Sequence, residues 1–301
     1  MKPVPPRRSA FHRRTMLAAG GAVFALLALA NCSPAGLLNS VSRISGDRAR
    51  LAAGGVAFGA DPRLKLDVWV PARQGAAKLP VVVFFYGGGW VSGERRDYGF
   101  AARAFAANGF IVIVPDYRLV PGARFPAFVE DGALAVKWAR DHAADHGGDP
   151  QRISLSGHSA GAYIAAMLAL DRRYLTAVGV DPAIIRAAAL LSGPYDFYPF
   201  TEPRGRDALG AWPRPAETQP ITYARADAPP MLLIHGTADT VVRPFNSEHL
   251  ATRLATLGAP VELKLYPGRS HIDTIKSLSP FFRGTTPALA DSVAFLQTHD
   301  R

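Results

Sequence analysis

The sequence is poor in cysteine and in charge. Cys32 is the only cysteine in 301 residues, so the chain can form no disulfide within itself and no metal site built from several cysteines. Charged residues make up 19% and hydrophobic residues 49%, a balance that excludes a disordered chain and favours a buried core. Although the formal net charge is +10, no basic stripe of the kind that binds nucleic acid is present. We therefore expect a globular protein with no nucleic-acid partner.

Acidic residues are absent before Cys32, and this first segment resembles an export signal. Its basic residues are Lys2, Arg7, Arg8, Arg13 and Arg14. An apolar run at 16–30 follows, which is shorter than the ~20 residues that a membrane span needs. Arg13 and Arg14 resemble a twin-arginine signal, which exports folded enzymes, and an ordinary secretory signal with extra arginines is the alternative.

Two processing sites compete at the end of this segment. Residues 28–30 read Ala-Leu-Ala, the small-residue pattern of ordinary cleavage. Residues 29–32 resemble a lipoprotein box in which Cys32 would be lipidated, although Asn31 departs from the small residue expected there. Both alternatives predict an exported protein, either periplasmic or a membrane-anchored lipoprotein. The resulting division is an export signal (1–32), a tether (33–50) and one folded domain (51–301).

Apolar runs alternate with helical patterns along the rest of the chain. The predicted strands lie at 64–70, 79–85, 110–114, 153–156, 187–191, 231–234 and 261–265. The predicted helices lie at 98–108, 127–146, 160–170, 244–257 and 287–297. This alternation predicts an α/β fold with a mostly parallel central sheet and helices on both faces. In such sheets, ligands bind beyond the carboxyl ends of the strands.

A Gly-x-Ser-x-Gly pentapeptide lies between a predicted strand and a predicted helix. Gly157 and Gly161 flank Ser159, and their missing Cβ atoms let strand and helix pass closely through a sharp turn. Such a turn presents a serine hydroxyl at the edge of the sheet, where the positive end of the helix dipole favours developing negative charge. Ser159 is therefore the predicted nucleophile.

Three glycines follow the strand at 79–85, in the segment Tyr86-Gly87-Gly88-Gly89-Trp90. Backbone N–H groups in such a loop approach a ligand without obstruction by side chains. Together with the Ala160 N–H, they are suited to bind the oxyanion of a tetrahedral intermediate. Trp90 beside this loop and Tyr195 in the irregular segment 192–223 are predicted to contact substrate. For that segment, a surface loop with a small satellite core is the alternative.

The base and the acid are predicted at two further strand ends. Asp239 follows the strand at 231–234, and His271 lies in a loop after the strand at 261–265. A serine hydroxyl needs a base, and the base needs an orienting acid. Among the competitors, His235 is predicted to be structural, His158 a neighbour of the nucleophile, and Asp273 too close in sequence to be the acid.

From residue 64 onward the motifs resemble α/β-hydrolase carboxylesterases, near the hormone-sensitive-lipase-like and feruloyl-esterase-like branches. Asp116-Tyr117-Arg118-Leu119 and Phe125-Pro126-Ala127 belong to the same resemblance. It implies an α/β-hydrolase fold, and Ser159, Asp239 and His271 as a catalytic triad. Oxyanion donors are implied at Gly88, Gly89 and Ala160. No metal or organic cofactor is implied.

Two departures from the family pattern refine this prediction. Tyr86 stands where the glycine loop usually begins with histidine, so the loop needs a different support. The helical N-terminal cap of lipase-like members is missing, which favours an open site and small ester substrates with short-chain or aromatic acids. A kynurenine-formamidase-like amide hydrolase is one alternative, suggested by the segment 192–196. A non-catalytic binding module on the same scaffold is the other.

Overall fold

The computed structural model describes residues 36, 38–40 and 47–300. The predicted export signal, Cys32 and most of the predicted tether lie outside these residues, so export and lipidation stay predictions. Within the described part of the chain, no helix combines the length and apolar character required to cross a membrane.

An eight-stranded sheet forms the centre of the domain, in the order β1-β2-β4-β3-β5-β6-β7-β8. Its strands are β1 Ala49–Ala57, β2 Lys65–Pro71, β3 Leu79–Phe85, β4 Ile111–Pro115, β5 Gly148–His158, β6 Ile185–Leu191, β7 Met231–Gly236 and β8 Val261–Tyr266. β2 pairs antiparallel with both β1 and β4, and all the other strand pairs are parallel. The predicted α/β class with a mostly parallel sheet is confirmed.

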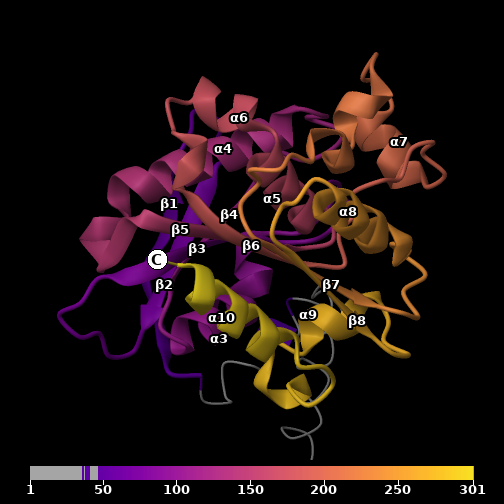
Figure 1. Cartoon of the computed structure of the whole chain (residues 1–301). Helices are drawn as coiled ribbons and strands as arrows, with labels where there is room; N and C mark the ends of the chain where they lie inside the picture. The colour runs from indigo at the N-terminus through magenta and orange to yellow at the C-terminus, as the bar shows by residue number, and fades with distance from the viewer. Residues whose placement is uncertain (1–35, 37, 41–46, 301) are drawn as a thin grey trace, which may run out of the picture.

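Helices cover both faces of the sheet (Figure 1). The longer ones are α3 Gly99–Ala107, α4 Ala127–His142, α5 Ala160–Leu170, α8 Phe245–Thr256 and α10 Ala288–His299, and the shorter ones are α6 Arg172–Ala177, α7 Pro203–Leu209 and α9 His271–Lys276. Short 3-10 turns are η1 Arg95–Tyr98, η2 Ala143–His146, η3 Pro182–Ile184, η4 Pro215–Thr218, η5 Pro220–Tyr223 and η6 Pro280–Phe282. α3 and α10 pack on one face, and α4, α5 and α8 pack on the other.

The structure differs from the sequence prediction at the start of the domain. β1 was not predicted, because its Ala- and Gly-rich sequence is half exposed at the sheet edge and has no regular apolar alternation. It begins at Ala49, inside the predicted tether. Asn39, also in that segment, is buried, and its Oδ1 accepts a 2.7 Å hydrogen bond from Nη2 of Arg103. The described part of the tether is therefore packed against the domain. Residues 36 and 38–40 are helical, and no large helical cap precedes the sheet among the described residues.

The predicted long helix at 127–146 is shorter in the structure. α4 ends at His142, and η2 continues the chain to His146 before Gly147 turns it with a φ of 85°. β5 then starts at Gly148, earlier than the sequence suggested, and runs straight into the turn that carries Ser159. Every residue of the following helix, α5, is buried. The nucleophile therefore stands between a central strand and an enclosed helix.

Candidate active site

Ser159 lies in a strained turn between β5 and α5. Its φ is 55° and its ψ is −122°, a conformation that costs roughly 1–3 kcal/mol in a non-glycine residue. The flanking glycines make the turn possible, because a Cβ at Gly161 would collide with the Phe85 carbonyl, and one at Gly157 would lie 2.6 Å from the Gly161 carbonyl carbon. The turn has the geometry of the predicted nucleophile elbow. Ser159 is partly exposed where the parallel strands end, which is the carboxyl edge of the sheet.

The glycine loop after β3 lies directly against this turn. A Cβ at Gly87 would stand 3.2 Å from the Cβ of Ser159. Gly88 and Gly89 have φ values of 139° and 61°, which L side chains rarely adopt. No acceptor in the described part of the chain takes a hydrogen bond from the N–H groups of Gly88, Gly89 or Ala160. Three free donors therefore lie around the nucleophile, as an oxyanion hole requires.

Asp239 and His271 are joined directly, although 32 positions separate them in the chain. Oδ2 of Asp239 accepts a 2.7 Å hydrogen bond from Nδ1 of His271, and both side chains are buried. Burial alone would raise the pKa of the Asp239 carboxyl, but hydrogen bonds from His235, His271 and the Val242 N–H hold this pKa well below its usual range. Asp239 is therefore ionised, and it leaves Nε2 of His271 free to act as a base.

The loops that carry the acid and the base are bonded to each other. The Ala238 N–H donates to the Arg269 carbonyl at 2.9 Å, and the Gly268 N–H donates to Oγ1 of Thr237 at 2.8 Å. His271 was predicted in a loop, whereas the structure places it at the first position of α9.

Asp273 caps the start of α9 and does not bond to the His271 ring. Its Oδ2 accepts hydrogen bonds from the backbone N–H of Ser270 at 2.7 Å and from the Ser270 hydroxyl at 2.9 Å, which forms a capping box. His235 lies beside the same carboxylate as His271, with its Nε2 3.2 Å from Oδ2 of Asp239, but both of its ring nitrogens are engaged. Its Nδ1 bonds to Oγ of Ser247 at 2.7 Å, and its Nε2 also bonds to the Val242 carbonyl at 2.8 Å. Neither residue competes for the role of base or acid in the triad.

His158 connects the nucleophile turn to the base. Its Nε2 donates to the His271 carbonyl at 3.2 Å, and the two rings have centroids 4.8 Å apart. Burial, and then the charge of His271, lowers the pKa of His158 to about 3, so this ring stays neutral near pH 7. The Ser159 hydroxyl itself makes no hydrogen bond within the described residues. Sequence reasoning treated His158 as a neighbour only, whereas in the structure it bonds to the His271 carbonyl, which also accepts from Oγ1 of Thr274 at 3.2 Å.

Tyr86 supports the glycine loop from beneath. Its buried ring stacks on Tyr117 with centroids 4.5 Å apart, and its hydroxyl accepts a 3.2 Å hydrogen bond from Nη2 of Arg63. The same nitrogen donates to the Gly93 carbonyl at 2.7 Å, while the Tyr117 hydroxyl donates to the Tyr86 carbonyl at 2.9 Å. This network provides the different support that the replacement of histidine by Tyr86 requires. Nothing in the local pattern around Arg63 identified its role.

A buried ionic cluster lies under the same loop. The Arg95 guanidinium pairs with Asp67 at 2.8 Å and also with Asp116, and the Arg95 N–H donates to Asp116 at 2.7 Å. All three side chains are largely removed from solvent. Asp116 could be found through its motif, but no signal identified its two partners, which come from other segments.

Trp90 and Tyr195, the two predicted substrate contacts, are both buried. Trp90 is 5% exposed and packs on Phe128 and Tyr163, with centroids 5.9 and 5.2 Å away. Tyr195 is 0% exposed and lies against Gly193. Trp90 adjoins the glycine loop, whereas the enclosed Tyr195 ring cannot form an open pocket wall in this conformation. Their contacts with substrate stay predictions.

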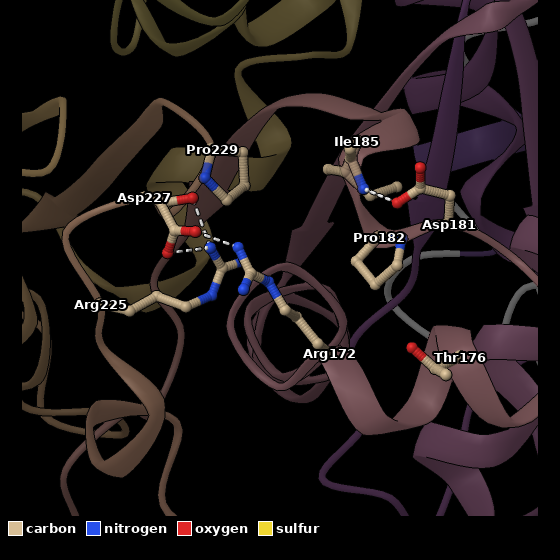
Figure 2. A pocket seen from close by; sticks show the side chains of 9 residues that line it. Arg172, Thr176, Asp181, Pro182, Ile185, Arg225, Asp227 and Pro229 are labelled. Carbon is tan, nitrogen blue, oxygen red and sulfur yellow. Dashed lines mark hydrogen bonds and ion pairs between the residues drawn. The ribbon is translucent and has the colours of Figure 1, made fainter.

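A surface pocket of about 540 Å³ lies at the amino edge of the sheet, where the parallel strands begin (Figure 2). Its lining includes Ile185 and Pro229, at or just before the amino ends of β6 and β7. Arg225 donates to the carbonyls of residues 169 and 170 and to Asp227, which also pairs with Arg172. Two guanidinium groups thus share one carboxylate, and the described lining of the pocket contains no serine, cysteine or histidine. Among the described residues, no cluster of three His, Cys, Asp or Glu side chains is suited to hold a metal ion.

Comparison with known proteins agrees with the geometry at the carboxyl edge. The BD-FAE family matches residues 66–254. The isoprenylcysteine alpha-carbonyl methylesterase ICME of Arabidopsis thaliana is 28% identical, over 81% of this chain and 62% of its own length. Esterase LipC of Mycobacterium tuberculosis is 30% identical, over 72% of this chain and 58% of its own length. The chain thus spans less than two thirds of the length of these two relatives.

A solved structure shares both the fold and part of the sequence. Thermogutta terrifontis esterase 2 phosphorylated by paraoxon is 28% identical with a TM-score of 0.63, over 74% of this chain and 84% of that chain. The predicted resemblance to α/β-hydrolase carboxylesterases is confirmed. Since the family match covers more than half of the sequence, this chain belongs to the BD-FAE family, on the scaffold of the α/β-hydrolase carboxylesterases.

Proposed function

We propose that this protein is a serine carboxylesterase that works through an acyl-enzyme intermediate. The observation that carries the proposal is the 2.7 Å bond between Asp239 and His271, beside a strained Ser159 turn with three unused N–H donors. The relatives named above are esterases, and one is described as phosphorylated by paraoxon. They favour ester hydrolysis over the amide-hydrolase and binding-module alternatives.

The proposed reaction has two halves. Oγ of Ser159 attacks the ester carbonyl while Nε2 of His271 takes its proton, and Asp239 stabilises the imidazolium that forms. The N–H groups of Gly88, Gly89 and Ala160 bind the oxyanion of the tetrahedral intermediate. When this intermediate collapses, His271 returns the proton to the leaving alcohol. His271 then activates a water molecule, which attacks the acyl-enzyme and releases the acid.

The substrates we propose are esters with short-chain or aromatic acids. The short stretch of sequence between the predicted export signal and the first strands supports an open site of this kind. Export belongs to the same proposal, with the protein periplasmic or anchored through a lipid on Cys32, and the basic, apolar order of the first segment supports it. Metabolic labelling of wild type and Cys32→Ser with a fatty acid tests the anchor, and equal labelling of the two proteins would contradict it.

The main test is hydrolysis of 4-nitrophenyl acetate by wild type and Ser159→Ala. We expect kcat to fall by roughly 10⁵-fold or more in the variant, since the remaining groups lack a nucleophile. Treatment with paraoxon should add one phosphoryl group to wild type and none to the variant, as seen by mass spectrometry. Ser40→Ala is the matched control, because Ser40 is an exposed serine whose hydroxyl, among the described residues, bonds to the Gly36 carbonyl alone. Equal rates in wild type and Ser159→Ala would end the proposal.

A further inference from the structure

The irregular segment 192–223 packs over the glycine loop. Phe197 stacks on Trp90 with centroids 6.2 Å apart and 12° between the ring planes. α7 follows and is held to this cluster through Gly205, which lies against the rings of Phe197 and Phe200. This packing places the residue before Gly205 in α7, Arg204, close to the glycine loop.

The side chain of Arg204 lies against Gly89. A Cβ at Gly89 would stand 2.7 Å from Cδ, 3.3 Å from Nη1 and 3.6 Å from Nε of Arg204. The guanidinium is therefore beside one of the three N–H donors that surround Ser159. A positive charge this close to the proposed oxyanion site is suited to discriminate between charged and neutral ester substrates.

The charge of Arg204 has no partner in the described part of the chain. No hydrogen bond or ion pair of its guanidinium is formed there, and the side chain is exposed. Arg206, on the same helix, differs, because it donates to the carbonyls of Phe200 and Thr201 at 3.4 and 2.9 Å. Arg118 is likewise occupied, in a 2.7 Å ion pair with Asp131. Among these three arginines, only Arg204 keeps its donors available.

We propose that Arg204 is a specificity-determining residue that binds a carboxylate carried by the ester substrate. The inference rests on the proposed esterase function and adds the charge of the preferred substrate. A guanidinium offers five N–H donors in a planar fork that matches a carboxylate. A substrate with a carboxylate a few bonds from the scissile carbonyl reaches this fork while its carbonyl oxygen occupies the oxyanion site. The carboxylate belongs to either the acid or the alcohol part of the ester.

The experiment compares charged and neutral esters in two arms. In the acid-side arm, mono-4-nitrophenyl succinate is compared with 4-nitrophenyl butyrate. In the alcohol-side arm, 4-acetoxybenzoate is compared with phenyl acetate. For each arm, the ratio of kcat/KM between the charged and the neutral ester is measured for wild type, Arg204→Gln, Arg204→Glu and the matched control Arg206→Gln.

We expect the ratio to fall about tenfold in Arg204→Gln in one arm, as for a partly exposed charged hydrogen bond. The variant should raise KM for the charged ester and leave kcat unchanged, because the carboxylate is bound equally in the ground state and the transition state. Arg204→Glu should lower the ratio further, while Arg206→Gln keeps it within about twofold. Both Arg204 variants should melt like wild type, because the side chain has no bonded partner among the described residues.

A ratio that stays within about twofold of wild type in both arms for both Arg204 variants overturns the inference. If kcat/KM falls equally for charged and neutral esters, the ratio is unchanged and Arg204 is instead a general electrostatic aid to the reaction. A failure of the proposed function looks different, because wild type and Ser159→Ala would then hydrolyse all four esters at the same rate.

Discussion

The two edges of the sheet use their polar groups in opposite ways. At the amino edge, Arg172 and Arg225 both pair with Asp227, and the remaining donors of Arg225 bind backbone carbonyls. At the carboxyl edge, the hydroxyl of Ser159 and three nearby N–H groups have no partner among the described residues. The carboxyl edge therefore retains a hydroxyl and hydrogen-bond donors that a substrate can engage.

The difference shows why a cavity alone does not locate the chemistry. The 540 Å³ pocket lies at the amino edge, where Arg172 and Arg225 already share the Asp227 carboxylate (Figure 2). The carboxyl edge has a backbone held in a strained conformation at Ser159, and a buried carboxylate with a depressed pKa at Asp239. Backbone strain and shifted pKa values are common at functional sites, where they serve the chemistry. The following variants test this contrast between the edges.

Asp239→Asn should have the largest effect. The substitution exchanges the carboxylate that accepts the Nδ1 proton of His271 for a neutral amide, so the imidazole loses its orientation and its preferred tautomer. We expect kcat for 4-nitrophenyl acetate to fall by about 10⁴-fold. A melting curve and a near-ultraviolet circular dichroism spectrum check that the variant is folded. A fall of less than about tenfold in a folded variant would show that another residue orients the base.

His158→Leu should have an intermediate effect. The substitution removes one of two side-chain donors to the His271 carbonyl, the other being Oγ1 of Thr274, and so loosens the start of α9. A displacement of the base by about 1 Å can cost about 10²-fold in rate. His158→Gln, whose amide can donate to the same carbonyl, should recover part of the loss. Because burial holds the pKa of His158 at about 3, the pH dependence of kcat above pH ~5 should keep its shape in both variants. If the pH dependence of kcat instead lost its acidic or its basic fall in these variants, His158 would be identified as a proton-transfer group.

Arg172→Gln, at the amino edge, should have the smallest effect. Its ion pair with Asp227 is exposed, and such pairs contribute little to stability. We expect kcat/KM within about twofold of wild type and a nearly unchanged melting temperature. Steady-state kinetics on the same ester measure the first, and differential scanning fluorimetry measures the second. A large loss of activity would mean that the two edges are coupled, and the contrast between them would fail.

The predicted nucleophile, acid and base could be proposed from the sequence because each follows a recognisable strand. Parallel strands bring their carboxyl ends to one edge, so the order of motifs was enough to predict that Ser159, Asp239 and His271 share it. The bond between Asp239 and His271 agrees with that prediction. The central strands were also predicted within a few residues, since their apolar runs are buried on both faces.

The parts that the sequence did not reveal depend on long side chains and on irregular backbone. Arg63 reaches Tyr86 across 23 positions, and Arg204 reaches the glycine loop from α7, a helix that was not predicted. No local pattern encodes such contacts, because they arise only when separate segments pack together. β1 was missed for another reason: a half-exposed edge strand rich in Ala and Gly lacks the periodicity that identifies a strand.

The complete enclosure of α5 has a consequence for how the proposed activity would be lost on heating. A helix with no solvent-facing side can neither fray nor detach by itself, so its amide protons should exchange only when the whole domain opens. Ser159 directly precedes this helix as its N-cap residue, and it would keep its geometry until the domain unfolds. Thermal inactivation and global unfolding should therefore coincide, with no earlier step in which the nucleophile alone is lost.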